Sequence, residues 1–139
     1  MNHHILLVED DQNDADFFRR AVRKLDAPPS VVWCRNGQDA LSQLRACTGR
    51  EELPRVAILD IKMPGMNGLE LLTELRKDED TKNIPVIMMS SSDEPRDIRR
   101  AYREGANSYV VKPNRFQDLS QLVRSIDTFW VHANRLRPN

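Results

Sequence analysis

Charged side chains stand at the ends of three apolar segments of this chain. Glu9-Asp10-Asp11 follows the first segment, Asp60 follows the third, and Lys112 follows the last. Carboxylates that gather at one point repel one another unless a cation neutralises them. A hard divalent ion with oxygen ligands does this, and Mg²⁺ is the usual choice where phosphate is handled. The pattern predicts a site for a divalent cation and a phosphoryl group.

Ser90 ends the fourth apolar segment and adds a hydroxyl that can donate to a phosphoryl oxygen. Pro113 restricts Lys112 to an extended conformation, which favours pairing with the carboxylates over the usual solvent-facing lysine. Each residue also has an ordinary interpretation. Residues 9–11 can cap a helix, with Asp11 as a solvated first-turn residue, and Asp60 can belong to a turn. Turn or cap chemistry is the preferred interpretation for Ser92.

Five apolar runs alternate with five amphipathic segments, which predicts a parallel sheet with right-handed crossovers and helices on both faces. Ligands bind such sheets at the carboxyl ends of the strands, where all these side chains fall. The predicted strands are 4–9, 30–34, 56–60, 85–90 and 108–111. The predicted helices are 14–25, 37–46, 68–77, a fourth from 92–95 to Gly105, and a fifth from about 115 to 135. The inward faces are expected to include Phe17 and Tyr102.

Composition narrows the class of protein. The chain has 139 residues, enough for one domain with a core. Its 21 basic and 21 acidic residues balance, which argues against nucleic-acid binding. No apolar stretch approaches the ~20 residues of a membrane span, and no signal peptide is evident. Cys34 and Cys47 fit neither a metal motif nor a disulfide framework, so we expect free thiols and a cytoplasmic location.

These motifs together resemble the receiver domain of two-component response regulators, the CheY-like family. The matching segments are 8–10, 59–68, 89–90 and 112–113, and their separations along the chain also match. The resemblance covers nearly the whole chain. It implies an α/β fold of flavodoxin-like type, (βα)5, with a doubly wound five-stranded parallel sheet in the order 2-1-3-4-5.

The resemblance also implies roles for the site residues. Asp60 is expected to accept a phosphoryl group from a histidine kinase. Mg²⁺ is expected on Asp10, Asp60 and the backbone carbonyl of Lys62, with Glu9 assisting through water. The protein would thus catalyse only its own phosphorylation and dephosphorylation, and would not be a metabolic enzyme.

Two further residues would hold the phosphoryl oxygens, namely Ser90 and Lys112. Ser90, which stands where the family more often has threonine, is expected to act with Tyr109 as a switch. A cis peptide is expected between Lys112 and Pro113. The Lys62 side chain would lie at the mouth of the site and slow hydrolysis, unless it points into solvent.

We expect residues 1–139 to form a single receiver domain with an extended C-terminal helix and no output domain, so that output depends on protein contacts. Segments 90–95, 106–109 and 129–130 resemble, more loosely, the stand-alone regulators paired with phytochrome kinases. Two alternatives stay open. A haloacid dehalogenase-type phosphatase would need Asp-x-Asp, but Lys62 occupies the second position. A receiver-fold scaffold without phosphorylation would not respond to beryllofluoride.

The apolar stripe of the fifth helix continues beyond the length that covers a sheet. Phe129, Trp130 and Leu136 would then project past the domain edge, unless they fold back as extra core. An exposed apolar patch marks an interface, and symmetric pairing is the commonest way to bury one. A homodimer through the end of the fifth helix is therefore expected.

Overall fold

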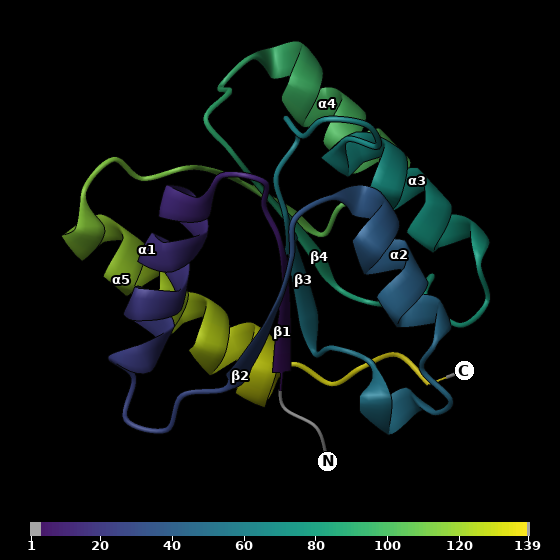
Figure 1. Ribbon diagram of the computed structural model, residues 1–139, viewed down its shortest axis with the longest axis horizontal. Helices are drawn as coiled ribbons and strands as arrows, with labels where there is room; N and C mark the ends of the chain where they lie inside the picture. The colour runs from purple at the N-terminus through teal and green to yellow at the C-terminus, as the bar shows by residue number, and fades with distance from the viewer. Residues whose placement is uncertain (1–3, 139) are drawn as a thin grey trace.

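A five-stranded parallel sheet forms the centre of the protein, which we describe from a computed structural model covering residues 4–138 (Figure 1). Its strand order is β2-β1-β3-β4-β5, as the resemblance implies. The strands are β1 (His4–Val8), β2 (Ser30–Cys34), β3 (Val56–Leu59), β4 (Val86–Ser90) and β5 (Ser108–Val111). The predicted β-α alternation is confirmed, and the strand bounds differ by a single residue at β1, β3 and β4.

Helices cover both faces of the sheet. In Figure 1, α1 and α5 lie on one side, and α2, α3 and α4 lie on the other. The helices are α1 (Gln12–Arg23), α2 (Gly37–Arg45), α3 (Gly68–Lys77), α4 (Pro95–Glu104) and α5 (Phe116–Ile126), with a 3-10 turn η1 (Arg50–Glu52) and a π-helical segment η2 (Asp127–Ala133). None of the helices within residues 4–138 is both long and apolar enough to cross a bilayer.

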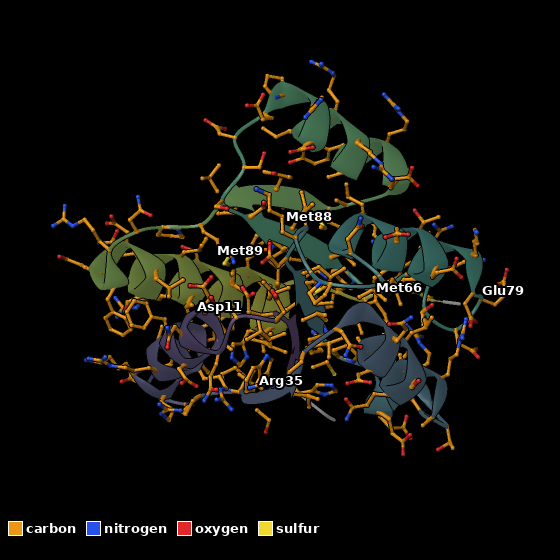
Figure 2. All side chains as sticks on the ribbon, turned by 45° about the horizontal axis from the view of Figure 1, so that its top comes forward. Asp11, Arg35, Met66, Glu79, Met88 and Met89 are labelled. Carbon is orange, nitrogen blue, oxygen red and sulfur yellow. The ribbon has the colours of Figure 1, made fainter. Side chains whose placement is uncertain are left out.

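The sheet separates two hydrophobic clusters. Side chains alternate between the faces of a strand, so neighbouring residues enter different clusters. Met88 of β4 packs with α2, α3 and α4, whereas Met89 packs with α1 and α5 (Figure 2). β1, β3 and β4 are buried along their whole length, as expected for strands covered on both faces.

Local sequence signals set several helix ends. The Asp11 carboxylate caps α1 by accepting a hydrogen bond from the Asp14 amide at 3.0 Å, so α1 begins two residues earlier than predicted. Asn67 and Glu70 form a reciprocal capping box at the start of α3. Gly105 ends α4 in the left-handed conformation, at φ 108°.

Two predicted core residues lie at the surface. Phe17 is 45% exposed and Tyr102 is 50% exposed. Phe17 packs edge-to-face on Phe116, with ring centroids 5.9 Å apart, at the rim between α1 and α5. The Tyr102 hydroxyl accepts a hydrogen bond from the Tyr109 amide at 3.2 Å, which keeps this ring along the surface of α4. Helical periodicity predicted that Phe17 and Tyr102 lie on the inward faces of their helices, but each residue lies at the border of that face.

The predicted extension of the fifth helix to about residue 135 is confirmed as far as Ala133, although the last turns are not α-helical. The α-helix ends at Ile126 and continues as η2, in which Val131 is fully buried. The chain then turns extended and runs beneath the N-terminal ends of the strands, as the yellow trace in Figure 1 shows. Arg55 donates to the Asn134 carbonyl at 2.9 Å, and Arg50 donates to the Arg137 carbonyl at 2.8 Å. These bonds fold the tail back onto the domain.

Candidate functional site

Three strand ends bring their charged side chains to one point. The Lys112 ammonium lies 2.7 Å from Glu9 Oε1 and 2.9 Å from Asp60 Oδ2. It also lies 2.9 Å from Asp14 Oδ2, on the first turn of α1. Glu9 follows β1, Asp60 follows β3 and Lys112 follows β5, so the parallel topology makes them neighbours although they are far apart in sequence. This arrangement confirms the predicted convergence.

The same point contains a candidate metal site. Glu9, Asp10 and Asp60 each offer a carboxylate oxygen, and these oxygens lie within 4.8 Å of one another. Such a set of hard oxygen donors suits Mg²⁺ or Mn²⁺. Asp11 is absent from this group because its carboxylate caps α1. The ordinary interpretation was therefore right for Asp11, while Glu9 and Asp10 face the site.

Burial and hydrogen bonding shift the pKa values of Glu9 and Lys112. Burial raises the pKa of Glu9 to about 7, and the nearby Asp60 carboxylate acts in the same direction against the hydrogen bond from Lys112. Burial would lower the pKa of Lys112, but its hydrogen bonds to Glu9, Asp14 and Asp60 raise this pKa above its ordinary value. Lys112 therefore stays cationic among the acidic groups.

The loop after β3 holds Asp60 in place. Asp60 is buried, with 7% of its surface exposed, and its Oδ1 accepts a hydrogen bond from the Lys62 amide at 3.3 Å. Gly68, the first residue of α3, approaches so closely that a Cβ there would lie 2.0 Å from the Asp60 carbonyl oxygen. Gly65 in the same loop has φ 73°, a conformation that favours glycine. These two glycines let the loop close tightly over Asp60.

Ser90 and Lys112 are tied together at the end of β4. The Ser90 side chain is fully buried, and its hydroxyl oxygen accepts a hydrogen bond from the Ser92 amide at 3.1 Å. The Ser90 carbonyl accepts from the Lys112 amide at 2.8 Å. The Ser92 hydroxyl oxygen accepts a hydrogen bond from the Glu94 amide at 3.2 Å, which is the turn chemistry predicted for it, and the hydroxyl donates to Asp97 at 2.6 Å.

The structure also tests the expectations for the Lys112–Pro113 peptide and for the Lys62 side chain. The Lys112–Pro113 peptide is trans, as are the other peptides of residues 4–138, so the predicted cis bond was wrong. The trans form is the intrinsically preferred one, and the Lys112 side chain reaches all three carboxylates from it. The Lys62 side chain is exposed and takes part in none of the ion pairs within the described residues.

The sequence interpretation missed two residues that shape the site. Asp14 contacts Lys112 from the first turn of α1, whereas the sequence pattern identified residue 14 only as the predicted start of a helix. The Trp33 indole donates to the Glu9 carbonyl at 2.8 Å and so fixes the backbone before the acidic group. Its place one residue before the end of β2, beside β1, was the available signal.

The chain matches known proteins over most of its length. Residues 5–124 match the family model described as response regulator receiver domain. The probable methanogenesis regulatory protein FilR2 of Methanothrix harundinacea is 38% identical over 94% of this chain and 85% of that protein. Response regulator Rcp1 of Synechocystis is 30% identical over 93% of this chain and 89% of that protein.

Solved structures agree with these matches. The phosphorylated cyanobacterial phytochrome response regulator RcpA is 31% identical, with a TM-score of 0.88 over 99% of this chain and all of that one. The Mn²⁺-bound form of Rcp1 is 28% identical, with a TM-score of 0.83 over 97% of this chain and 99% of that one. On the strength of the shared fold, the matching motifs and these similarities, the chain belongs to the family of response regulator receiver domains.

Proposed function

We propose that Asp60 is the residue of this response regulator that accepts a phosphoryl group from a histidine kinase. The observation that carries the proposal is the position of the Lys112 ammonium, 2.9 Å from Asp60 Oδ2 within a group of carboxylates. Aspartyl phosphate carries about −2 charge, which a site of buried acids alone would repel. A fixed cation beside Asp60 supplies part of the compensation.

The residues around Asp60 suit transfer of a phosphoryl group. An Asp60 oxygen forms the new bond to phosphorus while the bond to the donor imidazole nitrogen breaks, and the nitrogen keeps the electron pair. Lys112 and the Ser90 hydroxyl then stabilise the equatorial phosphoryl oxygens, and Tyr109 responds to the movement of Ser90. Catalysis of this kind depends on positioning and electrostatics, which are the contributions these side chains can make.

A divalent cation completes the proposed site. Glu9, Asp10 and Asp60, with the Lys62 carbonyl, would hold Mg²⁺, which when bound offsets the charge of carboxylates and phosphate. The Mn²⁺-bound form of Rcp1 supports a divalent ion in this family. We choose Mg²⁺ because hard oxygen donors beside a phosphate favour it.

The proposed upstream partner is a histidine kinase of the phytochrome type. RcpA is named for a phytochrome, and its structure matches this chain over its whole length. FilR2 shares a higher identity, 38% against 30% for Rcp1, and is named for methanogenesis. The rates of phosphoryl transfer from a purified phytochrome kinase and from a purified kinase of methanogenesis regulation would decide between these two upstream partners.

The proposed output is a change in protein contacts made by a single receiver domain spanning residues 1–139, acting as a homodimer in the cytoplasm. The exposed Phe129 beside Trp130 supports an interface at η2, which continues α5. Cys34 and Cys47 are both free thiols, in keeping with a reducing compartment.

Phosphorylation with acetyl phosphate and intact-mass analysis tests the central proposal. We expect one phosphoryl group per chain with Mg²⁺, and none with Asp60→Asn or with EDTA. Asp93→Asn, which changes an exposed aspartate, should label like the wild type. Labelling that survives Asp60→Asn would refute the role of Asp60, and a protein that neither labels nor responds to beryllofluoride would instead be an unphosphorylated scaffold.

A further inference from the structure

A pocket of about 260 Å³ lies near the N-terminal end of the sheet, away from Asp60. His4, the first residue of β1, lines it, whereas Glu9 follows the last residue of the same strand. Its walls come from β1, β2, the end of α2 and the segment around η1. The lining residues are His4, Leu6, Val32, Gln43, Leu44, Ala46, Cys47, Glu52 and Pro54.

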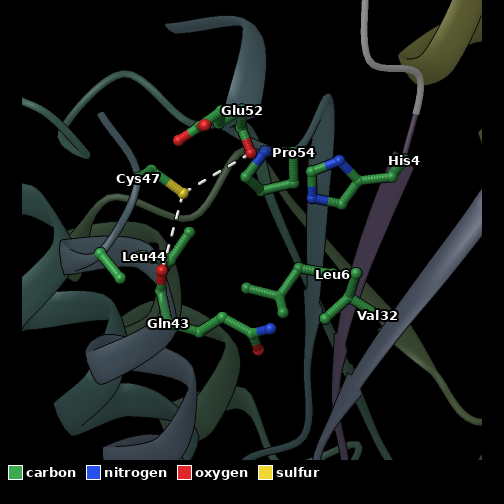
Figure 3. Close-up of a pocket in the computed structure, with 9 residues that line it drawn as sticks. His4, Leu6, Val32, Gln43, Leu44, Cys47, Glu52 and Pro54 are labelled. Carbon is green, nitrogen blue, oxygen red and sulfur yellow. Dashed lines mark hydrogen bonds between the residues drawn. The ribbon is translucent and has the colours of Figure 1, made fainter. Parts of the chain in front are cut away.

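His4 is a polar residue of this pocket, and its burial is not fully compensated by hydrogen bonds. The residue is only 7% exposed, and its Nδ1 has no hydrogen-bond partner within the described part of the chain. Figure 3 shows its ring extending from β1 towards the pocket, which Pro54 also lines. Burial lowers the pKa of His4, so the ring is uncharged at neutral pH and offers one donor and one acceptor nitrogen. A buried polar atom without a partner is uncommon in a folded protein.

The other polar groups of the pocket are largely satisfied or uncharged. The Cys47 sulfur lies 3.6 Å from the carbonyl oxygens of both Gln43 and Glu52, which share its single S–H donor (Figure 3). Burial, with Glu52 nearby, raises the pKa of Cys47 and keeps it protonated. The Glu52 carboxylate accepts two hydrogen bonds from Thr48. The remaining walls are mainly aliphatic, which disfavours a highly charged ligand.

The lining residues do not form a metal site. Among the described residues, the ligand atoms of histidine, cysteine and acidic side chains converge within 4.8 Å in the group of Glu9, Asp10 and Asp60, and His4, Cys47 and Glu52 form no such group. Size favours an organic molecule instead. An apolar cavity of ~150 Å³ accepts benzene, so a pocket of about 260 Å³ has room for a bicyclic ring.

We propose that this pocket is a second binding site, for a small uncharged aromatic molecule that carries one hydrogen-bonding group. Leu6, Val32 and Leu44 cover the faces of the ring system, and the His4 imidazole pairs with its polar group. Mainly apolar walls with a few placed polar groups are typical of small-molecule sites. The site is independent of the chemistry at Asp60, so it can be tested whether or not phosphorylation occurs.

Indole and indene are a matched pair of probes, because they share a bicyclic shape and differ in the N–H group. We expect indole to cause saturable shifts in the amide signals of His4, Val32 and Cys47 in protein-observed NMR. Indene should bind about fivefold more weakly, since a net hydrogen bond contributes roughly 1 kcal/mol. In His4→Leu the two probes should bind equally.

Two exposed residues, Ala46 at the C-cap of α2 and Ser42 within α2, provide a test variant and a control that leave the core intact. Ala46→Phe enlarges a residue that lines the pocket and should abolish the indole shifts, whereas Ser42→Phe, one turn earlier and outside the lining, should not. The proposal is overturned if indole causes no saturable shifts up to its solubility limit. It is also overturned if indole binds elsewhere, or if His4→Leu keeps the preference for indole.

Discussion

The Tyr109 hydroxyl donates a hydrogen bond to the Ser92 carbonyl oxygen at 2.8 Å, which ties β5 to the loop that follows Ser90. The Ser92 amide in turn donates to the Ser90 hydroxyl oxygen at 3.1 Å, so a ligand that draws this hydroxyl away breaks a bond to the residue that holds Tyr109. The two arrangements need differ by only a few kcal/mol for a phosphoryl group to select between them. This bond is the physical connection through which the proposed switch would act.

The first prediction concerns that bond. Tyr109→Phe keeps the ring but removes a bond with a net contribution of about 1 kcal/mol. We expect the variant to bind beryllofluoride with smaller amide shifts at residues 91–94 than in the wild type, in which Tyr109 becomes buried. Ser42→Ala, which removes an exposed hydroxyl on α2, is the control. A Tyr109 rotamer that is the same with and without beryllofluoride would contradict the coupling.

The second prediction concerns Lys112. Lys112→Met leaves Glu9 and Asp60 without their shared cation, and loss of one partner from a buried ion pair costs about 3 kcal/mol. The metal-free variant should unfold at a lower urea concentration, and Mg²⁺ should restore more stability to it than to the wild type. Lys62→Met, at an exposed position, should unfold like the wild type. Equal effects of Mg²⁺ on all three proteins would rule out the proposed compensation.

The third prediction concerns the lifetime of the phosphoryl group. The exposed Lys62 ammonium has no ion-pair partner within residues 4–138 and can turn towards phosphate on Asp60. It would then obstruct the water that attacks phosphorus. Lys62→Ala should lose its phosphoryl group faster than the wild type, with Lys77→Ala as a control at an exposed lysine on α3. If the two variants decay at the same rate, Lys62 points into solvent.

The fourth prediction concerns self-association. Phe129 is 52% exposed and packs edge-to-face on the half-buried Trp130, with centroids 5.0 Å apart. Aromatic anchors dominate interfaces, so Phe129→Ala should weaken a homodimer by about 2 kcal/mol, or roughly thirtyfold in Kd. Phe17→Ala, which removes a similarly exposed ring from α1, should not change it. Sedimentation at micromolar concentration is decisive, because a wild type that stays monomeric with and without beryllofluoride has no such dimer.

The fifth prediction concerns pH and His4. Burial lowers the pKa of His4, so its contribution to stability is present above about 6.5, the ordinary pKa of histidine, and is lost as pH falls towards the lower pKa of the folded state. The stability of the wild type relative to His4→Leu should therefore decrease between pH 7.5 and 5.5. Cys47 and Glu52, which line the same pocket, are present in both proteins, so their contributions to the free energy of unfolding cancel in the comparison. A difference that does not change with pH would mean that His4 titrates normally.

Much of the fold and the site followed from the sequence alone. Continuous apolar runs identified the five strands, which are covered on both faces, and amphipathic segments of period 3.6 identified the five helices, each of which buries one face. A parallel sheet then brings the ends of its strands to one edge, so Glu9, Asp60 and Lys112 could be placed together without coordinates. Gly65 and Gly68 belong to the same recognised motif, and the structure shows why glycine is needed there.

Tertiary packing decided the rest. Helical periodicity continues through Phe129 and Trp130, and the chain stays helical to Ala133, but as the π-helical segment η2, in which Val131 is buried. Beyond η2, the bonds from Arg50 and Arg55 hold an extended tail under the sheet. The contact between Asp14 and Lys112 and the exposure of Phe17 likewise depend on how α1 lies against its neighbours. The sequence determined which residues are apolar or charged, and the relative placement of distant segments determined which of them meet.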